Sequence, residues 1–176
     1  MNWAFSDESE RGSLMLFGLM TVRTAEVVRA RKELRALLLP GQRRVHTAKE
    51  SPPRRRQLLD VVGGLDVEAI VFRLRRPARM HRTTARDLLV QAACAALEPR
   101  AVANWVLDDQ DPVQAARDRR AIDHAIAGKA DVSYDHRPSH DEPLLWAVDA
   151  IVWAVGVGGS TLDRVRHLVN FVDLHP

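Results

Sequence analysis

Apolar runs of strand length alternate with segments of helical hydrophobic spacing along most of this chain. The runs predict strands at residues 2–6, 14–22, 44–47, 68–75, 101–107 and 131–136. The helical spacing predicts helices at 24–38, 52–63, 84–97, from 112 onward, from 143 through 149, and at 160–170, before a short irregular tail. Because 2–22 fits a hairpin and the later elements alternate, we expect an α/β or α+β layered domain, a mixed β-sheet flanked by helices.

Turn and cap residues mark the boundaries of these elements. Gly12 lies in the polar segment between the first two strands and predicts the hairpin turn. Thr24 suits the N-cap of the next helix, and Pro40-Gly41 ends it. Ser51-Pro52 and Asp111-Pro112 each place a capping side chain before a proline at the first helical position. No low-complexity linker interrupts the series, so we expect one domain over residues 1–176.

The composition describes an ordinary globular protein. Hydrophobic residues make up 46%, charged residues 28%, and the formal charge is only +3. The single cysteine, Cys94, excludes an internal disulfide framework and fits a reducing compartment. The N-terminal residues lack the basic and apolar regions of a signal peptide, and the apolar run at 144–157 is short for a membrane span and carries a charge. We therefore expect a cytoplasmic protein without membrane contact.

That charge belongs to Asp149, the only ionisable residue between Leu144 and Val157. An ionised carboxylate on an apolar helix is costly unless it is paired, hydrogen-bonded or bound to a metal. Asp149 therefore carries the strongest functional claim in the sequence, against the alternatives of a solvent-facing position or an arginine partner.

Two further acidic pairs follow predicted strands. Asp7 and Glu8 close the apolar segment 3–5, and Asp108 and Asp109 close the segment 102–107. Acids at the ends of two strands, together with one on an apolar helix, are what a carboxylate-bound metal site needs. Turn chemistry competes as an explanation for the first pair, and a solvated loop for the second.

Four short motifs occur in order along the chain: the opening Phe5-Ser6-Asp7-Glu8-Ser9, the returning apolar strand, the strand ending Leu107-Asp108-Asp109, and the late helix 144–149. Together they resemble an uncharacterised bacterial family, the domain of unknown function 3800 family. The likeness covers most of the chain. The family typically has Gln-x-x-Asp on the late helix, whereas this chain reads Trp146-Ala147-Val148-Asp149, with the Asp kept and the Gln absent.

The family is similar to the ribonuclease-H-like superfamily, so the resemblance implies that fold and a shared set of acids. Carried over to this chain, the set is Asp7 with Glu8 as its neighbour, Asp108 or Asp109, and Asp149. Since side chains alternate along a strand, only one of Asp7 and Glu8 can point into a given site, and Asp7 is preferred. Oxygen ligands of this kind suit Mg²⁺ or Mn²⁺. Two such ions about 3.5–4 Å apart stabilise the attacking and leaving oxygens of a phosphodiester.

Other polar groups have both a functional and an ordinary explanation. Glu50 could add an acid after a short strand, or it could be a surface residue. His136 and His140 could bind a metal, but no cysteine or second histidine pair completes a zinc site. The arginines at 54–56 and between 73 and 82 could contact a phosphate backbone, although solvated helix faces are the commoner cause of such runs.

Two main hypotheses of function remain open at this point. The first is a Mg²⁺- or Mn²⁺-dependent nuclease or related phosphoryl-transfer enzyme acting on nucleic acid. The second is a non-catalytic ribonuclease-H-like module that binds nucleic acid or another protein, motivated by the absent Gln. A third possibility is a domain that works only with an operon partner protein, through an apolar interface to which the tryptophans contribute.

Overall fold

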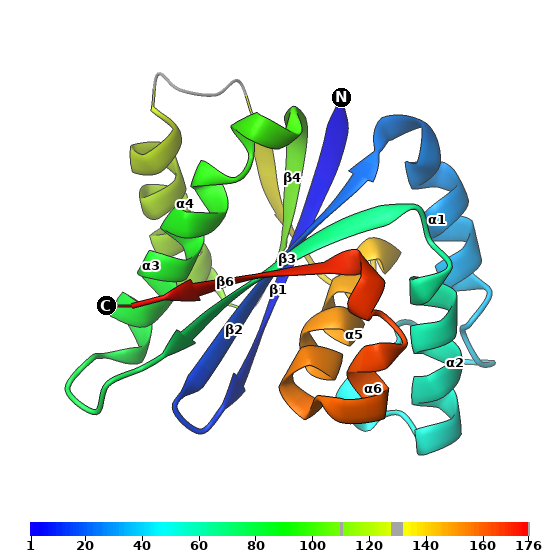
Figure 1. Cartoon of the computed structure of the whole chain (residues 1–176). Helices are drawn as coiled ribbons and strands as arrows, with labels where there is room; N and C mark the ends of the chain where they lie inside the picture. The colour runs from blue at the N-terminus through cyan, green and yellow to red at the C-terminus, as the bar shows by residue number, and fades with distance from the viewer. Residues whose placement is uncertain (110, 128–131, 176) are drawn as a thin grey trace.

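A mixed β-sheet forms the centre of the computed structural model, which describes residues 1–109, 111–127 and 132–175 (Figure 1). In that part of the chain six strands lie in the order β5-β4-β1-β2-β3-β6. Their bounds are Asn2–Arg11 for β1, Leu14–Arg23 for β2, Val67–Arg75 for β3, Val102–Asp108 for β4, Ser133–Arg137 for β5 and Val169–Leu174 for β6. Strands β1, β2 and β3 pair antiparallel, whereas β4, β5 and β6 join by parallel pairing.

Helices cover both faces of the sheet. Helices α3 (Arg82–Ala95) and α4 (Pro112–Ile126) lie on one face, and α1 (Val27–Arg35), α2 (Pro52–Gly63), α5 (Pro143–Val157) and the short α6 (Gly159–Asp163) lie on the other (Figure 1). Each face has its own buried apolar cluster. This layered arrangement, a mixed sheet with an apolar cluster between it and the helices on each face, confirms the predicted fold class.

Helix α5 is the apolar centre of its layer. It packs on β1 and β2 and is covered in turn by α1 and α2. Most of its residues are buried, including Trp146, which is 1% exposed. Glu142 is the N-cap of the helix, and its carboxylate accepts a hydrogen bond from the backbone N–H of Leu144. The helix ends at Gly158, whose φ is 74°. No described helix is long and apolar enough to cross a bilayer.

The first strand is longer than predicted. Strand β1 continues to Arg11 and pairs with β2 along its whole length, and the turn falls at Gly12, with φ 60°. Asp7 and Glu8 therefore lie within a strand instead of closing one. Since strand side chains alternate, these two neighbours face opposite layers of the protein.

Three element predictions were wrong, the last being the irregular tail, where strand β6 forms instead, and one prediction extends past the described residues. Residues 44–47 form no strand; they belong to a loop that ends in a 3-10 turn, Thr47–Lys49. Residues 160–170 hold only the short α6 and a second 3-10 turn before β6, which pairs with the outer edge of β3. That pairing depends on a partner strand about a hundred residues away, so local spacing did not reveal it. The predicted strand at 131–136 begins outside the described residues, and β5 starts at Ser133.

Candidate active site

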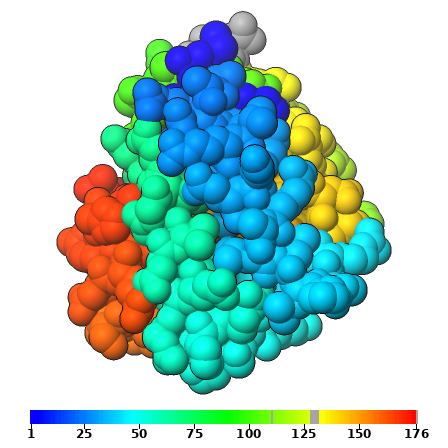
Figure 2. Space-filling view, turned by 90° about the vertical axis from the view of Figure 1, so that its right-hand side faces the viewer, coloured from blue at the N-terminus to red at the C-terminus, as the bar shows by residue number. Residues whose placement is uncertain are grey.

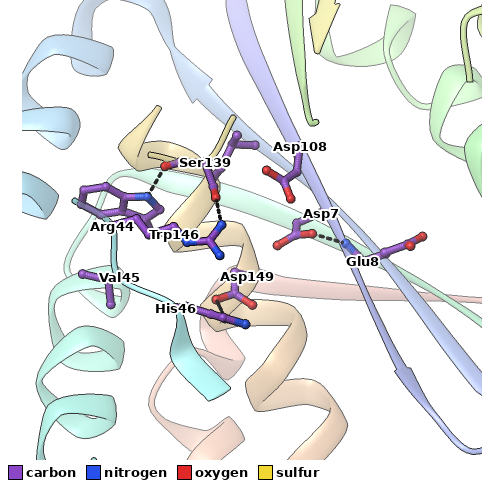
Figure 3. A pocket seen from close by; sticks show the side chains of 10 residues that line it. Asp7, Glu8, Arg44, Val45, His46, Asp108, Ser139, Trp146 and Asp149 are labelled. Atoms are coloured by element: carbon purple, nitrogen blue, oxygen red, sulfur yellow. Dashed lines mark hydrogen bonds and ion pairs between the residues drawn. The ribbon is translucent and has the colours of Figure 1, made fainter. Parts of the chain in front are cut away.

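Three carboxylates from distant parts of the chain line one cavity on the α5 face of the sheet (Figure 3). The cavity has a volume of about 230 Å³. The carboxylates are those of Asp7, Asp108 and Asp149, and Figure 3 shows them pointing toward a common space. The rest of the polar and aromatic lining comes from Glu8, Arg44, His46, Ser139 and Trp146.

The parallel pairing of β1 and β4 places two of these acids side by side. Ser6 is the register partner of Leu107, so the next residues along the strands are Asp7 and Asp108. Phe5, two residues before Asp7, belongs to the apolar cluster on the α5 face. Alternation then points the Asp7 side chain to the same face, toward α5.

Asp149 approaches from α5 and is held by the loop that was predicted to be a strand. Its Oδ2 accepts hydrogen bonds from the backbone N and the Oγ1 of Thr47, both at 2.9 Å. The Nδ1 of His46 lies 3.4 Å from the same oxygen. The other oxygen, Oδ1, accepts no hydrogen bond from the described residues. The carboxylate is thus oriented through one oxygen and leaves the other available to a ligand.

Burial and neighbouring negative charge disfavour the ionised forms of Asp7 and Asp108. Burial, and then the negative charges of Asp149 and Asp108, raise the pKa of Asp7 well above its ordinary value. Burial also raises the pKa of Asp108 to about 6, against the opposing charge of Arg44. In addition, the Oδ1 atom of Asp108 is buried without a hydrogen-bond partner among the described residues. Such a group is stabilised by protons or by a cation.

The three carboxylates are the kind of ligand that a hard divalent cation prefers, although their side chains are not arranged around a common metal position. Within residues 1–109, 111–127 and 132–175, no group of three or more His, Cys, Asp or Glu side chains is placed to hold a metal ion. The unpartnered Oδ1 of Asp108 and the free Oδ1 of Asp149 are the oxygen donors that Mg²⁺ and Mn²⁺ prefer.

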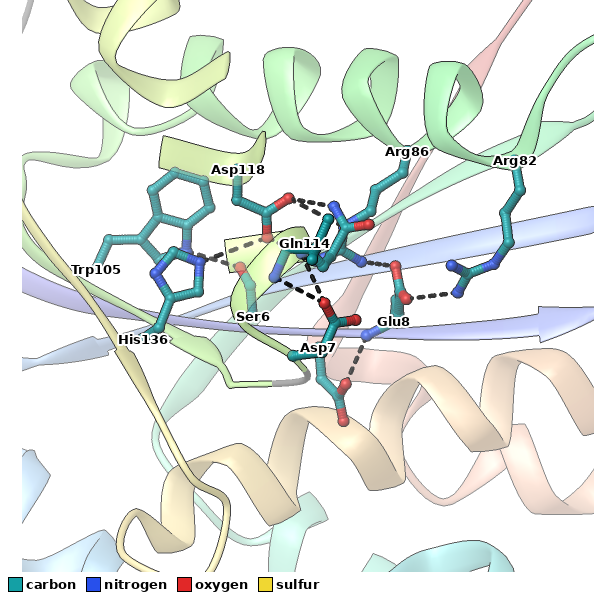
Figure 4. A network of polar contacts seen from close by, with 11 residues as sticks. Ser6, Asp7, Glu8, Arg82, Arg86, Trp105, Gln114, Asp118 and His136 are labelled. Carbon is teal, nitrogen blue, oxygen red and sulfur yellow. Dashed lines mark hydrogen bonds and ion pairs between the residues drawn. The ribbon is translucent and has the colours of Figure 1, made fainter. Parts of the chain in front are cut away.

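Two carboxylates of the predicted ligand set, those of Glu8 and Asp109, do not point toward the other three, although Glu8 borders the cavity. The Glu8 carboxylate faces the opposite layer, where it forms ion pairs with Arg82, at 2.9 Å, and with Arg86 (Figure 4). Only its backbone serves the cluster, through an N–H that donates to Asp7 Oδ1 at 2.7 Å. Asp109 is exposed just beyond β4 and is absent from the cavity lining. We therefore exclude both side chains from the candidate site.

The ion pairs of Glu8 belong to a buried network beneath α3 and α4 (Figure 4). Arg86 also pairs with Asp118 at 2.8 Å, and Gln114 Nε2 donates to the same carboxylate at 2.8 Å. Although burial opposes it, hydrogen bonds from His136 and Arg86 hold the pKa of Asp118 well below its ordinary value. His136 thus serves this network, and the metal site considered for His136 with His140 does not form.

The loop between α1 and α2 supplies the site residues that the sequence did not reveal. Arg44, His46 and Thr47 lie within four positions of one another in it, and Arg44 Nη1 donates to Ser139 Oγ at 2.5 Å. Figure 2 shows this light-blue and cyan loop beside the yellow segment that precedes α5. The nearby Glu50 instead accepts a hydrogen bond from Gln42 Nε2 at 2.6 Å and does not line the cavity.

Comparison of the structure with solved proteins identifies the fold. Over 95% of this chain and 77% of the other, it superposes on ribonuclease HII from Archaeoglobus fulgidus, solved in complex with PCNA, with a TM-score of 0.62 and 17% sequence identity. The fold is ribonuclease-H-like. Neither a scan against protein-family models nor a search of curated proteins finds a match. At that identity the ribonuclease-H-like likeness establishes the fold and not the activity.

Proposed function

We propose that this protein is a divalent-metal-dependent phosphodiesterase, a nuclease of the domain of unknown function 3800 family. The observation that carries the proposal is the meeting of Asp7, Asp108 and Asp149 in one cavity of a ribonuclease-H-like fold. Two strands and a helix provide the acids, and burial disfavours the charge of Asp7 and Asp108 unless a cation is present. A carboxylate cluster on this fold is suited to phosphoryl transfer.

Asp7, Asp108 and Asp149 would hold Mg²⁺ or Mn²⁺, which when bound polarises a phosphoryl oxygen and makes a bound water more acidic. The chain's own contribution is positional. Thr47 orients Asp149 by two hydrogen bonds, and the backbone N–H of Glu8 orients Asp7. Hydrogen bonding through one oxygen while the other faces a ligand is the usual support for a metal-binding carboxylate.

The test is a nuclease screen with Mn²⁺ on labelled single-stranded and double-stranded DNA and RNA and on an RNA–DNA hybrid. We expect wild-type protein to cleave at least one of these and Asp7→Asn and Asp149→Asn to lose that cleavage while circular dichroism shows a retained fold. Cleavage that survives both substitutions would contradict the proposal. The matched control is Asp109→Asn, which removes an acid next to the site but outside its lining, and it should remain active.

One observation favours the second candidate, a non-catalytic module that binds nucleic acid or another protein. Trp146 stands where the family has Gln, and its indole N–H donates a hydrogen bond to the carbonyl oxygen of Ser139. If the missing amide is essential, the fold would bind without turnover. Salt-sensitive nucleic-acid binding that needs no divalent metal, with no cleavage in the screen, would select this alternative.

A further inference from the structure

Arg44 provides a positively charged side chain at the candidate site, and most N–H donors of its guanidinium have no hydrogen-bond partner among the described residues. It lines the cavity together with Asp7, Asp108 and Asp149. Its one hydrogen bond among the described residues goes to Ser139 Oγ, and no described carboxylate forms an ion pair with it. A guanidinium carries five N–H donors in a fixed fork. Most of these donors therefore remain available beside the three acids.

The position of Arg44 is fixed from the far side by α5. Trp146 is buried in that helix, and its Nε1 donates to the carbonyl oxygen of Ser139, whose hydroxyl accepts from Arg44 (Figure 3). Ser139 thus joins a rigid indole to a flexible arginine. The tryptophan that replaces the family's Gln supports this connection, so the departure from the motif has a structural role in this chain.

A cation beside a carboxylate cluster selects a particular class of ligand. Three carboxylates repel an anion, so Arg44 by itself does not make the cavity an anion site. Once a divalent cation neutralises the acids, an anion that bridges the metal and the guanidinium is favoured. The ligand that matches both is a phosphoryl group, because its oxygens bind Mg²⁺ or Mn²⁺ and accept paired hydrogen bonds from arginine.

We propose that Arg44 is the phosphate-binding residue of this site and that the Trp146–Ser139 contact presents it to a metal-bound phosphoryl group. This inference rests on the proposed function, since it requires the divalent cation. It adds the residue that recognises the substrate's phosphate and assigns a role to the sequence departure at position 146.

The experiment uses Mn²⁺ and inorganic phosphate as probes, so that no substrate has to be known. Calorimetry measures Mn²⁺ affinity, and broadening of the phosphate ³¹P resonance by protein-bound Mn²⁺ measures phosphate affinity. Arg44→Ala should weaken phosphate about tenfold or more, as expected for a charge-assisted hydrogen bond. Its Mn²⁺ affinity should be kept or raised, because removal of a cation beside three carboxylates favours a second cation.

Three further variants distinguish a direct contact between Arg44 and phosphate from a general effect of net charge. Arg43→Ala removes the neighbouring exposed arginine, which is outside the cavity lining, and should leave phosphate affinity unchanged. Arg44→Lys keeps the charge but loses the fork and should fall between wild type and Arg44→Ala. Ser139→Ala leaves every charge in place and should weaken phosphate several-fold with unaltered Mn²⁺ affinity, whereas a purely structural role for Ser139 would not separate the two affinities.

The outcomes distinguish the two levels of the proposal. Wild-type protein that binds no Mn²⁺ contradicts the proposed function and with it this inference. Wild-type protein that binds Mn²⁺ and phosphate, with Arg44→Ala equal to wild type or Arg43→Ala equally impaired, overturns the role of Arg44 alone.

Discussion

Gly18 on β2 lies directly opposite Asp7 on β1, and helix α5 passes over the pair. A Cβ atom at position 18 would stand 2.5 Å from Val152 Cγ2 and 2.8 Å from Val148 Cγ2. Both valines flank Asp149 on α5, one residue before it and three after it. The missing side chain therefore allows the helix to approach the sheet where Asp7 and Asp149 share the cavity.

We predict that Gly18→Ala weakens the site as well as the fold. The added methyl meets β-branched side chains that have little freedom to move, so α5 must shift outward. The expected cost is about 1–3 kcal/mol in the free energy of unfolding, measured with urea, and a loss of Mn²⁺ affinity measured by calorimetry. Gly64→Ala is the control, because its Cβ would have only ordinary contacts, the nearest at 3.5 Å. Unchanged Mn²⁺ affinity in Gly18→Ala would show that helix approach does not set the site.

Thr47→Val tests whether the orientation of Asp149 matters for metal binding. The substitution removes the hydroxyl donor and keeps the backbone N–H and nearly the same volume in a fully buried position. We expect roughly a tenfold loss of Mn²⁺ affinity, as is typical when a residue that orients a metal ligand is changed. Thr47→Ser restores the hydroxyl and should recover most of it. If Ser and Val behave alike, the backbone N–H alone orients the carboxylate.

The stability of the metal-free protein and the stabilisation that Mn²⁺ adds should depend on pH in opposite directions. The folded-state pKa of Asp108, about 6, lies above its ordinary value of 3.8, so its stabilising contribution is complete below 3.8 and is lost as the pH rises through 6. The raised pKa of Asp7 acts in the same direction. Divalent cations need the deprotonated acids, so the increase in Tm caused by Mn²⁺ should grow between pH 5 and pH 7.5. An increase in Tm that is independent of pH in the wild type would argue against binding at these carboxylates.

The parts of the site that followed a periodic pattern were predictable, and the parts held by long-range contacts were not. Alternation correctly predicted that Asp7 and Glu8 face opposite sides of their strand, and the apolar run around Asp149 correctly predicted a buried helix. The loop with Arg44 and Thr47 has no periodicity, and its structure depends on α2, where Arg55 donates to the Thr47 carbonyl oxygen at 2.9 Å. Strand β6 likewise depends on the free edge of β3.

Asp7 and Glu8 are adjacent in sequence, yet their substitution by amides should have opposite effects on stability. Asp7→Asn removes a buried carboxylate that is disfavoured by burial and by two neighbouring acids, so the metal-free protein should gain stability while Mn²⁺ binding is lost. Glu8→Gln removes the partner of the buried Arg86, which keeps only Asp118, and should cost roughly 1–3 kcal/mol while Mn²⁺ binding is retained. Urea unfolding and Mn²⁺ calorimetry on the two variants measure both effects. If Glu8→Gln also abolished Mn²⁺ binding in a folded protein, the Glu8 side chain would have a role in the metal site as well as in the network beneath α3 and α4.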